Sequence, residues 1–368
     1  MKRVWLFWVA TLLLILLCGC KQKNETESPA SERSDPFAVE GSGSSGVIAV
    51  DSLKNAYNPL TGISNMAGDR VGIRPVAVSV NNISLAWPQY GTSMADYIIE
   101  TETEGGITRL LCVYADTREV PVIGSVRSLR DQFIEATYPL NPIIVHIGTS
   151  VYADRMIAAY DYRTLDAGNY PVSIWTDRVR LESYASEHCK FTGGEAINAG
   201  ITAAGIAEES DSKISAFSFV GENDPPIVPG TGKADAVKYN FSSYYDGDFR
   251  YDAESGKYLK WQFGKPQLDA GNNNVQLSFN NVFLLFADIS PIPGIALVQV
   301  DFLSGGEGYY FTEGYYEKII SLKKSGFESN FRFLKEDGSE LLVNVGKTHL
   351  GIVDEDLISR LMISDEQE

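Results

Sequence analysis

The spacing of apolar residues along the chain changes near residue 220. Before it, short apolar or alternating runs, which predict strands, take turns with segments of helical spacing. Strands are expected at residues 76–80, 96–101, 107–114, 142–147 and 172–175, and helices at residues 128–138, 150–160 and 194–207. Strands that alternate with helices are typical of layered domains. We therefore expect an α/β N-terminal domain, a mixed sheet with helices, over residues 53–220.

The pattern after residue 236 is that of a β-rich domain. Its apolar runs are short and rich in aromatic and β-branched residues, and turn sequences at residues 252–256 and 336–339 separate some of them. Strands are expected at residues 237–241, 249–251, 258–263, 282–286, 296–302, 308–311, 316–322, 331–334 and 341–345. Residues 221–236, rich in Pro, Gly and acid, are the expected linker. We therefore expect a β-rich C-terminal domain over residues 237–355 and an acidic tail over residues 356–368.

The first twenty residues have the pattern of a secretory signal peptide. Lys2 and Arg3 precede an apolar run at residues 4–17. A helix needs about 20 residues to cross a membrane, so this run is short for the alternative interpretation, a single transmembrane anchor. The sequence Leu17-Cys18-Gly19-Cys20 resembles the lipobox of bacterial lipoproteins, which implies that Cys20 becomes the acylated N-terminus. The polar residues 21–52 are then expected to be a flexible tether.

The charge of the chain limits its partners. The formal net charge is −17, and loss of residues 1–20, which carry two cations and no acid, makes it −19. This balance argues against nucleic acid, because phosphate binding needs a basic face, and against broad attraction to anionic lipid. We expect the acyl chains on Cys20 to hold the protein at the outer face of the cytoplasmic membrane.

The remaining cysteines leave one pairing open. Processing at Cys20 would leave Cys112 and Cys189 as the two thiols that could form a disulfide in an oxidising compartment. Because Cys112 lies in an apolar strand, we expect two separate thiols, with a bridge as the alternative.

Ordered motifs over residues 57–353 resemble the YerB family of bacterial lipoproteins, found mainly in Gram-positive lineages. The resemblance implies an N-terminal domain, a separate β-rich C-terminal domain and a Gram-positive type of envelope, and it supplies no chemistry. The chain departs from the family at Glu187-His188-Cys189, near Ser321 and at Thr348-His349. The matching pieces are Asn58-Pro59-Leu60-Thr61-Gly62, Arg74-Pro75-Val76-Ala77-Val78, Pro88-Gln89, Gly91, Ala95-Asp96, Glu100, Glu104-Gly105-Gly106-Ile107-Thr108-Arg109, Gly124-Ser125-Val126-Arg127-Ser128, Arg130, Val145-His146, Gly148, Gly306, Gly308-Tyr309-Tyr310-Phe311-Thr312, Gly314, Arg332-Phe333 and Gly346-Lys347-Thr348.

The strongest candidate for chemistry is the segment at residues 124–130, which opens the helix expected at 128–138. Ser125 and Ser128 are natural N-caps, and the free N–H groups and positive dipole end of a helix gather there. Arg127 and Arg130, three residues apart, would share one helix face and accept a carboxylate or phosphate. The alternative is structural: Arg127 could pair with Asp131 at the i, i+4 spacing, and Arg130 could bind an internal acid.

A second candidate is an acidic strand. Glu100, Glu102 and Glu104 alternate, so all three are expected on one face, with Arg109 opposite them on the returning strand. A general acid or base, or a hard cation, would suit such a face, and a solvated sheet edge is the alternative. No zinc-spaced cysteine cluster or phosphate-binding loop is present, so we predict no metal and no cofactor.

The three histidines have different expected places. His146 ends an apolar strand, where ligands bind in α/β proteins, and is either an acid–base group or a core histidine. His188 is expected in a loop, and His349 at the surface or on an edge strand. Gly-x-Ser-x-Gly and His-Glu-x-x-His are absent from the sequence, and Ser321-Leu-Lys-Lys324 fits Ser-x-x-Lys but lies at an expected strand end rather than at the start of a helix.

These residues favour a binding or scaffolding module, with a cell-wall fragment or another carboxylated envelope molecule as the ligand. The expected cleft in the first domain is lined by Arg127, Arg130, Arg109, Ser125, Ser128 and His146, has Glu104 and His188 on its rim, and is closed by Tyr309, Tyr310 and Phe311 of the second domain. One alternative is a cell-wall enzyme that uses Glu104 and His146 as its acid–base pair. The other is a protein–protein adaptor in which the Arg and Glu network is purely structural.

Overall fold

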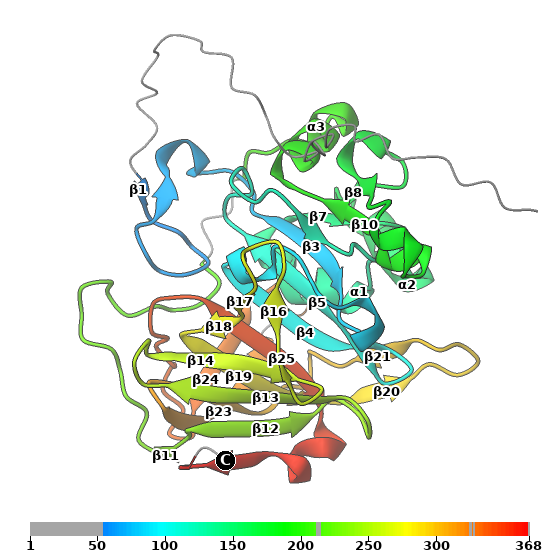
Figure 1. The fold of residues 1–368 in the computed structure, drawn as a ribbon. Coiled ribbons are helices and arrows are strands. Elements are labelled where there is room, and N and C mark those ends of the chain that lie inside the picture. Colours follow the sequence, from blue (N-terminus) through cyan, green and yellow to red (C-terminus); the bar gives the residue numbers. More distant parts are fainter. Residues whose placement is uncertain (1–53, 211–214, 324–325, 327, 367–368) are drawn as a thin grey trace, which may run out of the picture. The chain divides into compact units, whose positions relative to one another are not determined.

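The computed structural model describes residues 54–210, 215–323, 326 and 328–366 (Figure 1), all of them within one compact unit, Ala49–Glu368. The predicted signal peptide, the acylation site Cys20 and the tether at residues 21–52 lie outside the described residues. No helix in the described part of the chain is long and apolar enough to cross a membrane.

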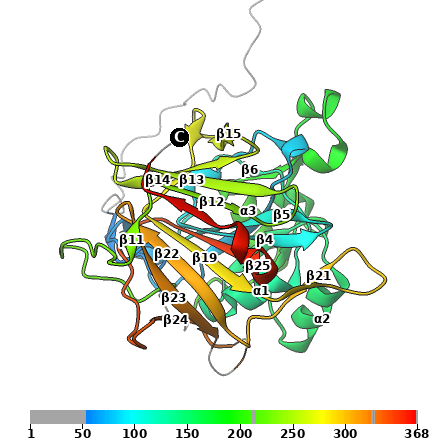
Figure 2. The same ribbon diagram turned by 90° about the horizontal axis from the view of Figure 1, so that it is seen from below.

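One large mixed sheet of eleven strands runs through both halves of the sequence. Its order is β11-β23-β22-β19-β25-β4-β5-β3-β7-β8, with β24 beside β23, and Figure 2 shows its central strands side by side. The strands are β3 (Val76–Asn81), β4 (Tyr97–Glu104), β5 (Ile107–Tyr114), β7 (Ile143–His146), β8 (Leu165–Asp166), β11 (Gly232–Lys233), β19 (Asn281–Ala287), β22 (Gly306–Thr312), β23 (Tyr315–Lys323), β24 (Phe331–Lys335) and β25 (Thr348–Asp354).

The two halves of the sequence meet inside this sheet. β25, from the second half, pairs in parallel with β4, from the first half, over the register Thr348↔Tyr97 to Ile352↔Thr101. β25 also pairs in parallel with β19 on its other side. Backbone hydrogen bonds therefore join the two halves without an interruption of the sheet.

A second sheet of six strands and several small ones complete the β structure. The six-stranded order is β15-β14-β13-β12-β26, with β18 paired to β14, and a three-stranded sheet has the order β6-β10-β9. These strands are β12 (Ala236–Asn240), β13 (Asp246–Asp252), β14 (Lys257–Gln262), β15 (Lys265–Pro266), β18 (Ser278–Phe279), β26 (Met362–Ser364), β6 (Ile123–Gly124), β9 (Trp175–Thr176) and β10 (Lys190–Thr192). The two-stranded pairs are β1 (Lys54–Ala56) with β2 (Met66–Ala67), β16 (Leu268–Asp269) with β17 (Val275–Gln276), and β20 (Ile289–Pro291) with β21 (Val298–Val300).

The described residues form three α-helices, all in the first half, as the sequence pattern predicts. They are α1 (Asp131–Thr137), α2 (Val151–Ala159), capped by the Ser150 side chain, and α3 (Gly194–Ala204), which ends at the left-handed Gly205. The 3₁₀ turns are Gly68–Arg70, Ser84–Ala86, Thr92–Met94, Tyr138–Leu140, Pro171–Ser173, Arg180–Glu182, Ser186–His188 and Glu355–Arg360.

Two expected strands are wrong. Residues 172–175 begin in the 3₁₀ turn Pro171–Ser173, in which the Ser173 hydroxyl donates to the Tyr170 carbonyl, and only β9 follows. Residues 341–345 form no strand and contribute one bridge, between Val343 and Phe219. The fold class is confirmed nonetheless, with a mixed sheet and few helices in the first half and mostly strands in the second.

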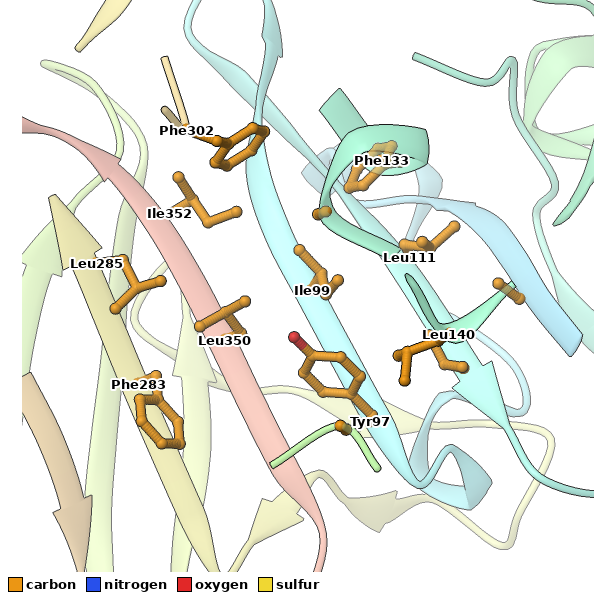
Figure 3. Packing of buried hydrophobic residues seen from close by; sticks show 14 of the residues in the cluster. Tyr97, Ile99, Leu111, Phe133, Leu140, Phe283, Leu285, Phe302, Leu350 and Ile352 are labelled. Carbon is orange, nitrogen blue, oxygen red and sulfur yellow. The ribbon is translucent and has the colours of Figure 1, made fainter. Parts of the chain in front are cut away.

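The large sheet separates two hydrophobic cores, because its side chains alternate between its faces. On one face, Ile99 and Leu111 of the first half pack with Leu350 of the second half and with Phe133 of α1 (Figure 3). On the other face, the apolar side chains of the large sheet pack against the six-stranded sheet and α3; examples are Ile98, Leu110, Val282, Leu284, Val237, Phe249, Tyr258, Ile197 and Ile201. Both cores contain residues from both halves.

Candidate functional site

The predicted site segment lies at the carboxyl edge of the parallel strands. β3, β4, β7, β8, β19 and β25 run in one direction, since the antiparallel β5 lies between β4 and β3. Residues 125–127 cross this edge: the Ser125 carbonyl accepts from the Asn81 amide at 2.9 Å, and the Arg127 amide donates to the Ser79 carbonyl at 2.8 Å. Ligands of open α/β sheets bind at this edge.

The segment is not the start of a helix, so the predicted N-cap roles of Ser125 and Ser128 are wrong. α1 begins at Asp131, and its N-cap residue Arg130 makes no side-chain cap bond. The Ser125 hydroxyl is buried without a hydrogen-bond partner among the described residues. The Ser128 carbonyl accepts from Arg109 and from the Ser79 hydroxyl. Extended backbone bonded to β3 replaces the first helical turn that the sequence suggested.

Glu104 holds two of the predicted arginines. Arg130 donates from Nε to Oε2 at 2.9 Å and from Nη2 to Oε1 at 3.0 Å, and Arg109 donates from Nη2 to Oε1. Burial alone would raise the pKa of Glu104, but the charges of Arg109 and Arg130 lower it below its usual range. Glu104 is therefore ionised at neutral pH, and Arg130 has the internal acid of the structural alternative.

The charges around this carboxylate do not balance. The pKa of the buried Arg109 is lowered by desolvation and by the charge of Arg130, is raised by Glu104, and is lowered again by the charge of Arg127. Arg127 does not pair with Asp131: it lies 3.8 Å from the exposed carboxylate of Glu187. Arg109 and Arg130 thus share one half-buried carboxylate, which leaves one guanidinium charge in excess there, while Arg127 faces the carboxylate of Glu187.

The three alternating carboxylates do not share one face, contrary to the expectation. The register of β4 and β5 shifts between Glu102 and Glu104, as at a β-bulge. Glu104 reaches Arg109 on one side of the sheet, Glu100 is buried on the other, and Glu102 accepts from the Gly106 amide at 2.8 Å. A three-carboxylate cation site is therefore absent from β4.

His188 presents a hydrogen-bond donor beside Arg127. Asn81 Oδ1 accepts from the Ile83 amide at 3.3 Å, which directs the Asn81 amide group to donate to His188 Nδ1 at 3.0 Å. In the neutral ring the proton then lies on Nε2. That atom has no hydrogen-bond partner among the described residues and is not completely enclosed, although the His188 side chain as a whole is buried, 5% exposed. The ring is neutral because burial lowers the pKa of His188 and the charges of Arg127 and Arg180 also lower it, against Glu187.

Arg180 positions the His188 loop and was missed by the sequence reasoning. It is buried, donates from Nε to the His188 carbonyl at 2.9 Å and from Nη2 to the Ala86 carbonyl. Its guanidinium carbon lies 4.0 Å from the centre of the Tyr184 ring. Arg180 stands in a charged stretch without a motif, so no sequence signal distinguishes it from a surface arginine.

Three other predicted site residues lie in the core or away from the arginine segment. Both ring nitrogens of the buried His146 have protein partners at 2.9 Å, the Gly148 carbonyl and the Thr164 hydroxyl, so His146 is a core histidine. Tyr309 and Tyr310 lie in β22, which is three strands from β4, or about 14 Å at the usual strand spacing. The Tyr310 hydroxyl is buried against Asn281 Oδ1, at 2.7 Å. The structure therefore does not bring the tyrosines to the arginine segment.

Comparison with known proteins agrees with the architecture. Residues 60–207 match the family model described as "Protein of unknown function (DUF3048) N-terminal domain", and residues 236–350 match the model for the DUF3048 C-terminal domain. The chain belongs to the DUF3048 family. Over 307 residues it is 26% identical to "Putative lipoprotein YerB" of Bacillus subtilis (strain 168), a match that covers 82% of this chain and 88% of the relative.

A solved structure has the same fold. The crystal structure of the YerB protein from Bacillus subtilis matches with a TM-score of 0.71 and 24% identity, over 84% of this chain and 99% of that chain. The resemblance to YerB predicted from the sequence is confirmed. At this identity the structural match speaks for the fold alone.

The two thiols in the described part of the chain are not bridged. Cys112 and Cys189 are both free and buried. Burial raises the pKa of each thiol, so neither is a thiolate at neutral pH. The prediction of two separate thiols is confirmed, and the disulfide alternative is wrong.

A buried charged cluster was missed by the sequence reasoning. Glu100 of β4, Lys260 of β14 and His349 of β25 are all fully buried between the large sheet and the six-stranded sheet. The expectation that His349 lies at the surface or on an edge is wrong, because β25 is a central strand. Single charged residues in alternating strands give no sequence signal of such a cluster.

The main hollows lie away from the arginine segment. One of about 420 Å³ is lined by Glu135, Asp288, Ser290, Gln299, Asp301 and neighbours, and an apolar groove of about 340 Å³ is lined by Tyr57, Pro59, Leu60, Val71, Ile73 and neighbours. Neither hollow is lined by Arg127 or His188.

Proposed function

We propose that this DUF3048 protein is a lipid-anchored binding module of the cell envelope, with an anion-accepting surface at Arg127 and His188. The relative named as a lipoprotein and the signal-peptide pattern ending at Cys20 both support attachment to a membrane. The orientation, at the outer face of the cytoplasmic membrane of a Gram-positive type of envelope, belongs to the same proposal.

The observation that carries the proposal is the gathering of hydrogen-bond donors at this surface, where the exposed Glu187 carboxylate also lies, 3.8 Å from Arg127. Arg127 and the Nε2–H of neutral His188 are both donors, and the charges of Arg109 and Arg130 behind them exceed that of Glu104. A carboxylate or phosphate is the group that such donors accept. Because the chain has a net charge of −17, a local excess of positive charge is unusual and requires cationic residues from several segments to meet. Cell-wall fragments carry the required anionic groups.

The enzyme alternative has less support. Glu104 is engaged by two guanidinium groups, and both nitrogens of His146 are engaged by core partners. A general acid or base needs a proton site within reach of a substrate, and neither residue offers one in this arrangement.

A co-sedimentation experiment tests the proposal. The chain from Lys21 onward, with and without Arg127→Ala/His188→Ala, is mixed with purified cell-wall sacculi and centrifuged. We expect the unchanged protein to pellet and the double variant to pellet at least about tenfold less, with binding that weakens as salt rises. Arg163→Ala is the matched control, since Arg163 is exposed and pairs with Asp161 at 2.9 Å.

The same samples separate the alternatives. Soluble wall fragments in the supernatant, released by the unchanged protein and lost in the double variant, would indicate a wall enzyme. Protein that stays in the supernatant beside intact sacculi would refute wall binding and favour a protein adaptor, for which the apolar groove at Val71 and Ile73 would be the first surface to examine.

A further inference from the structure

The buried cluster between the two sheets brings an amine and a carboxylate into contact. Lys260 Nζ lies 2.8 Å from Glu100 Oε2, and both side chains are completely buried. The other neighbours of Nζ are neutral: the Tyr239 hydroxyl at 3.4 Å and the Phe249 ring centre at 5.0 Å. This pair joins the two halves of the chain, 160 residues apart.

The two carboxylate oxygens of Glu100 have different hydrogen-bond partners. Oε1 accepts from Asn82 Nδ2 at 2.7 Å, from Thr108 Oγ1 at 2.8 Å and from Gln262 Nε2 at 3.3 Å. Oε2 contacts Lys260 and His349. Three donors aimed at one oxygen would stabilise negative charge that collects there, which is the arrangement of an oxyanion hole.

His349 supplies a proton-carrying group at the second oxygen. Its Nε2 lies 3.1 Å from Glu100 Oε2, and its Nδ1 is buried without a hydrogen-bond partner among the described residues. Burial and the charge of Lys260 lower the pKa of His349 to about 4, against the opposing Glu100, so the ring is neutral. A neutral ring bonded to a carboxylate through Nε2 donates its proton there.

Water exclusion favours the loss of both charges. Burial of an ion pair costs the desolvation free energy of two ions. The desolvation cost of a neutral amide whose oxygen is hydrogen-bonded is far smaller. Burial also keeps out the water that would hydrolyse an amide.

We propose that Lys260 and Glu100 condense to an intramolecular isopeptide bond. A proton passes from Nζ to Oε2, which gives an amine and a carboxylic acid, and Nζ then attacks Cδ while negative charge collects on Oε1. A second proton passes from Nζ to Oε2, with His349 Nε2 as the adjacent relay. The Cδ–Oε2 bond breaks, one water leaves, and Oε1 becomes the amide carbonyl. The step consumes one ammonium and one carboxylate and needs no oxidant or cofactor.

Peptide mapping of the full chain tests the bond. The protein is extracted from membranes with detergent, denatured, digested and analysed by mass spectrometry. We expect one branched peptide that carries both Glu100 and Lys260, lighter by one water, about 18 Da, than the sum of its two parts. Both peptides unlinked, at their ordinary masses, in the natively folded protein would overturn the proposal.

Two further measurements separate this bond from other water losses. Chain made in an unfolded state should have its full mass and should lose one water on refolding, because the geometry exists only in the folded protein. Lys260→Arg keeps a buried cation next to Glu100 and removes the amine, so it should keep its full mass. A water loss that persists in this variant places the bond elsewhere and defeats the proposal.

Discussion

At the scale of single residues, burial and nearby charges set the charge states of the candidate site residues. Glu104 is ionised between Arg109 and Arg130, and His188 is neutral beside Arg127. Each state follows from the neighbours that the fold supplies, not from the residue type. Two predictions belong to this scale.

Replacement of Glu104 should destabilise the protein in a pH-dependent way. Glu104→Gln leaves Arg109 and Arg130 without their carboxylate and should cost about 3 kcal/mol of unfolding free energy at pH 7, as measured by urea denaturation. The folded pKa of Glu104 is lowered, so its contribution is complete above the ordinary carboxyl pKa of about 4.3 and is lost as the pH falls through the folded value. Equal stabilities of the two proteins at pH 7 would contradict this account.

Arg180 should act on binding through His188. Arg180→Met removes the bonds to the His188 and Ala86 carbonyls and should lower stability by about 1–3 kcal/mol. It should also weaken sacculus binding, although Arg180 lies buried behind the proposed surface. Arg180→Lys keeps the charge but not the fork of donors, so it should rescue neither. Full binding by the Met variant would show that the loop needs no such support.

At the scale of elements, a small hairpin connects the two halves. Asp269 at the end of β16 is fully buried, and its carboxylate accepts from the Gly91 amide at 2.7 Å and from the Ser93 amide and hydroxyl at 2.8 and 2.7 Å. Lys347 donates to the Ser93 carbonyl at 2.5 Å. The turn at residues 91–93 is thus bonded by the second half of the chain from two sides.

Loss of this carboxylate should loosen the connection between the halves. Asp269→Ala leaves the amides of Gly91, Ser93 and Gly271 without their carboxylate and should lower the unfolding free energy by about 2–4 kcal/mol. Asp252→Ala is the matched control, since Asp252 accepts similar bonds from Ser255 in an exposed turn, and it should destabilise the protein much less. Thermal and urea unfolding of the two variants compare them directly, and similar losses would argue against a special role of Asp269.

At the scale of the whole molecule, the shared sheet makes the two halves dependent on each other. If residues 53–220 were produced alone, the edge of β4 that pairs with β25 would be open. If residues 237–366 were produced alone, they would expose the edge of β25 that pairs with β4, together with apolar side chains of both cores. Open edges and exposed cores lead to aggregation. We expect each half to be insoluble or unfolded alone and co-production to restore soluble protein, as judged by size-exclusion chromatography and circular dichroism. A monomeric, folded half would contradict this.

The proposed attachment of the chain to a membrane depends on one residue, Cys20. Cys20→Ser should move the protein from the membrane fraction to the soluble fraction, and metabolic labelling with a fatty acid should label the unchanged protein alone. Retention of the variant in membranes would support the transmembrane interpretation of residues 4–17 instead.

The sequence by itself determined the local features of this protein. The spacing of apolar residues predicted the three helices and most of the strands, because local periodicity follows from the geometry of the element. The ordered motifs gave the family, and the prediction of separate thiols was correct. The domain boundaries and the lipid anchor stay predictions.

Only the tertiary structure decided which residues meet. The bulge in β4 turned Glu104 toward Arg130, the pairing of β4 with β25 joined the two halves, and the packing of the two sheets placed Lys260 and His349 on Glu100. Partners in these contacts are 26 to 251 residues apart. Charge states and contacts of this kind depend on burial and on distant neighbours, and the local sequence pattern carries no information about either.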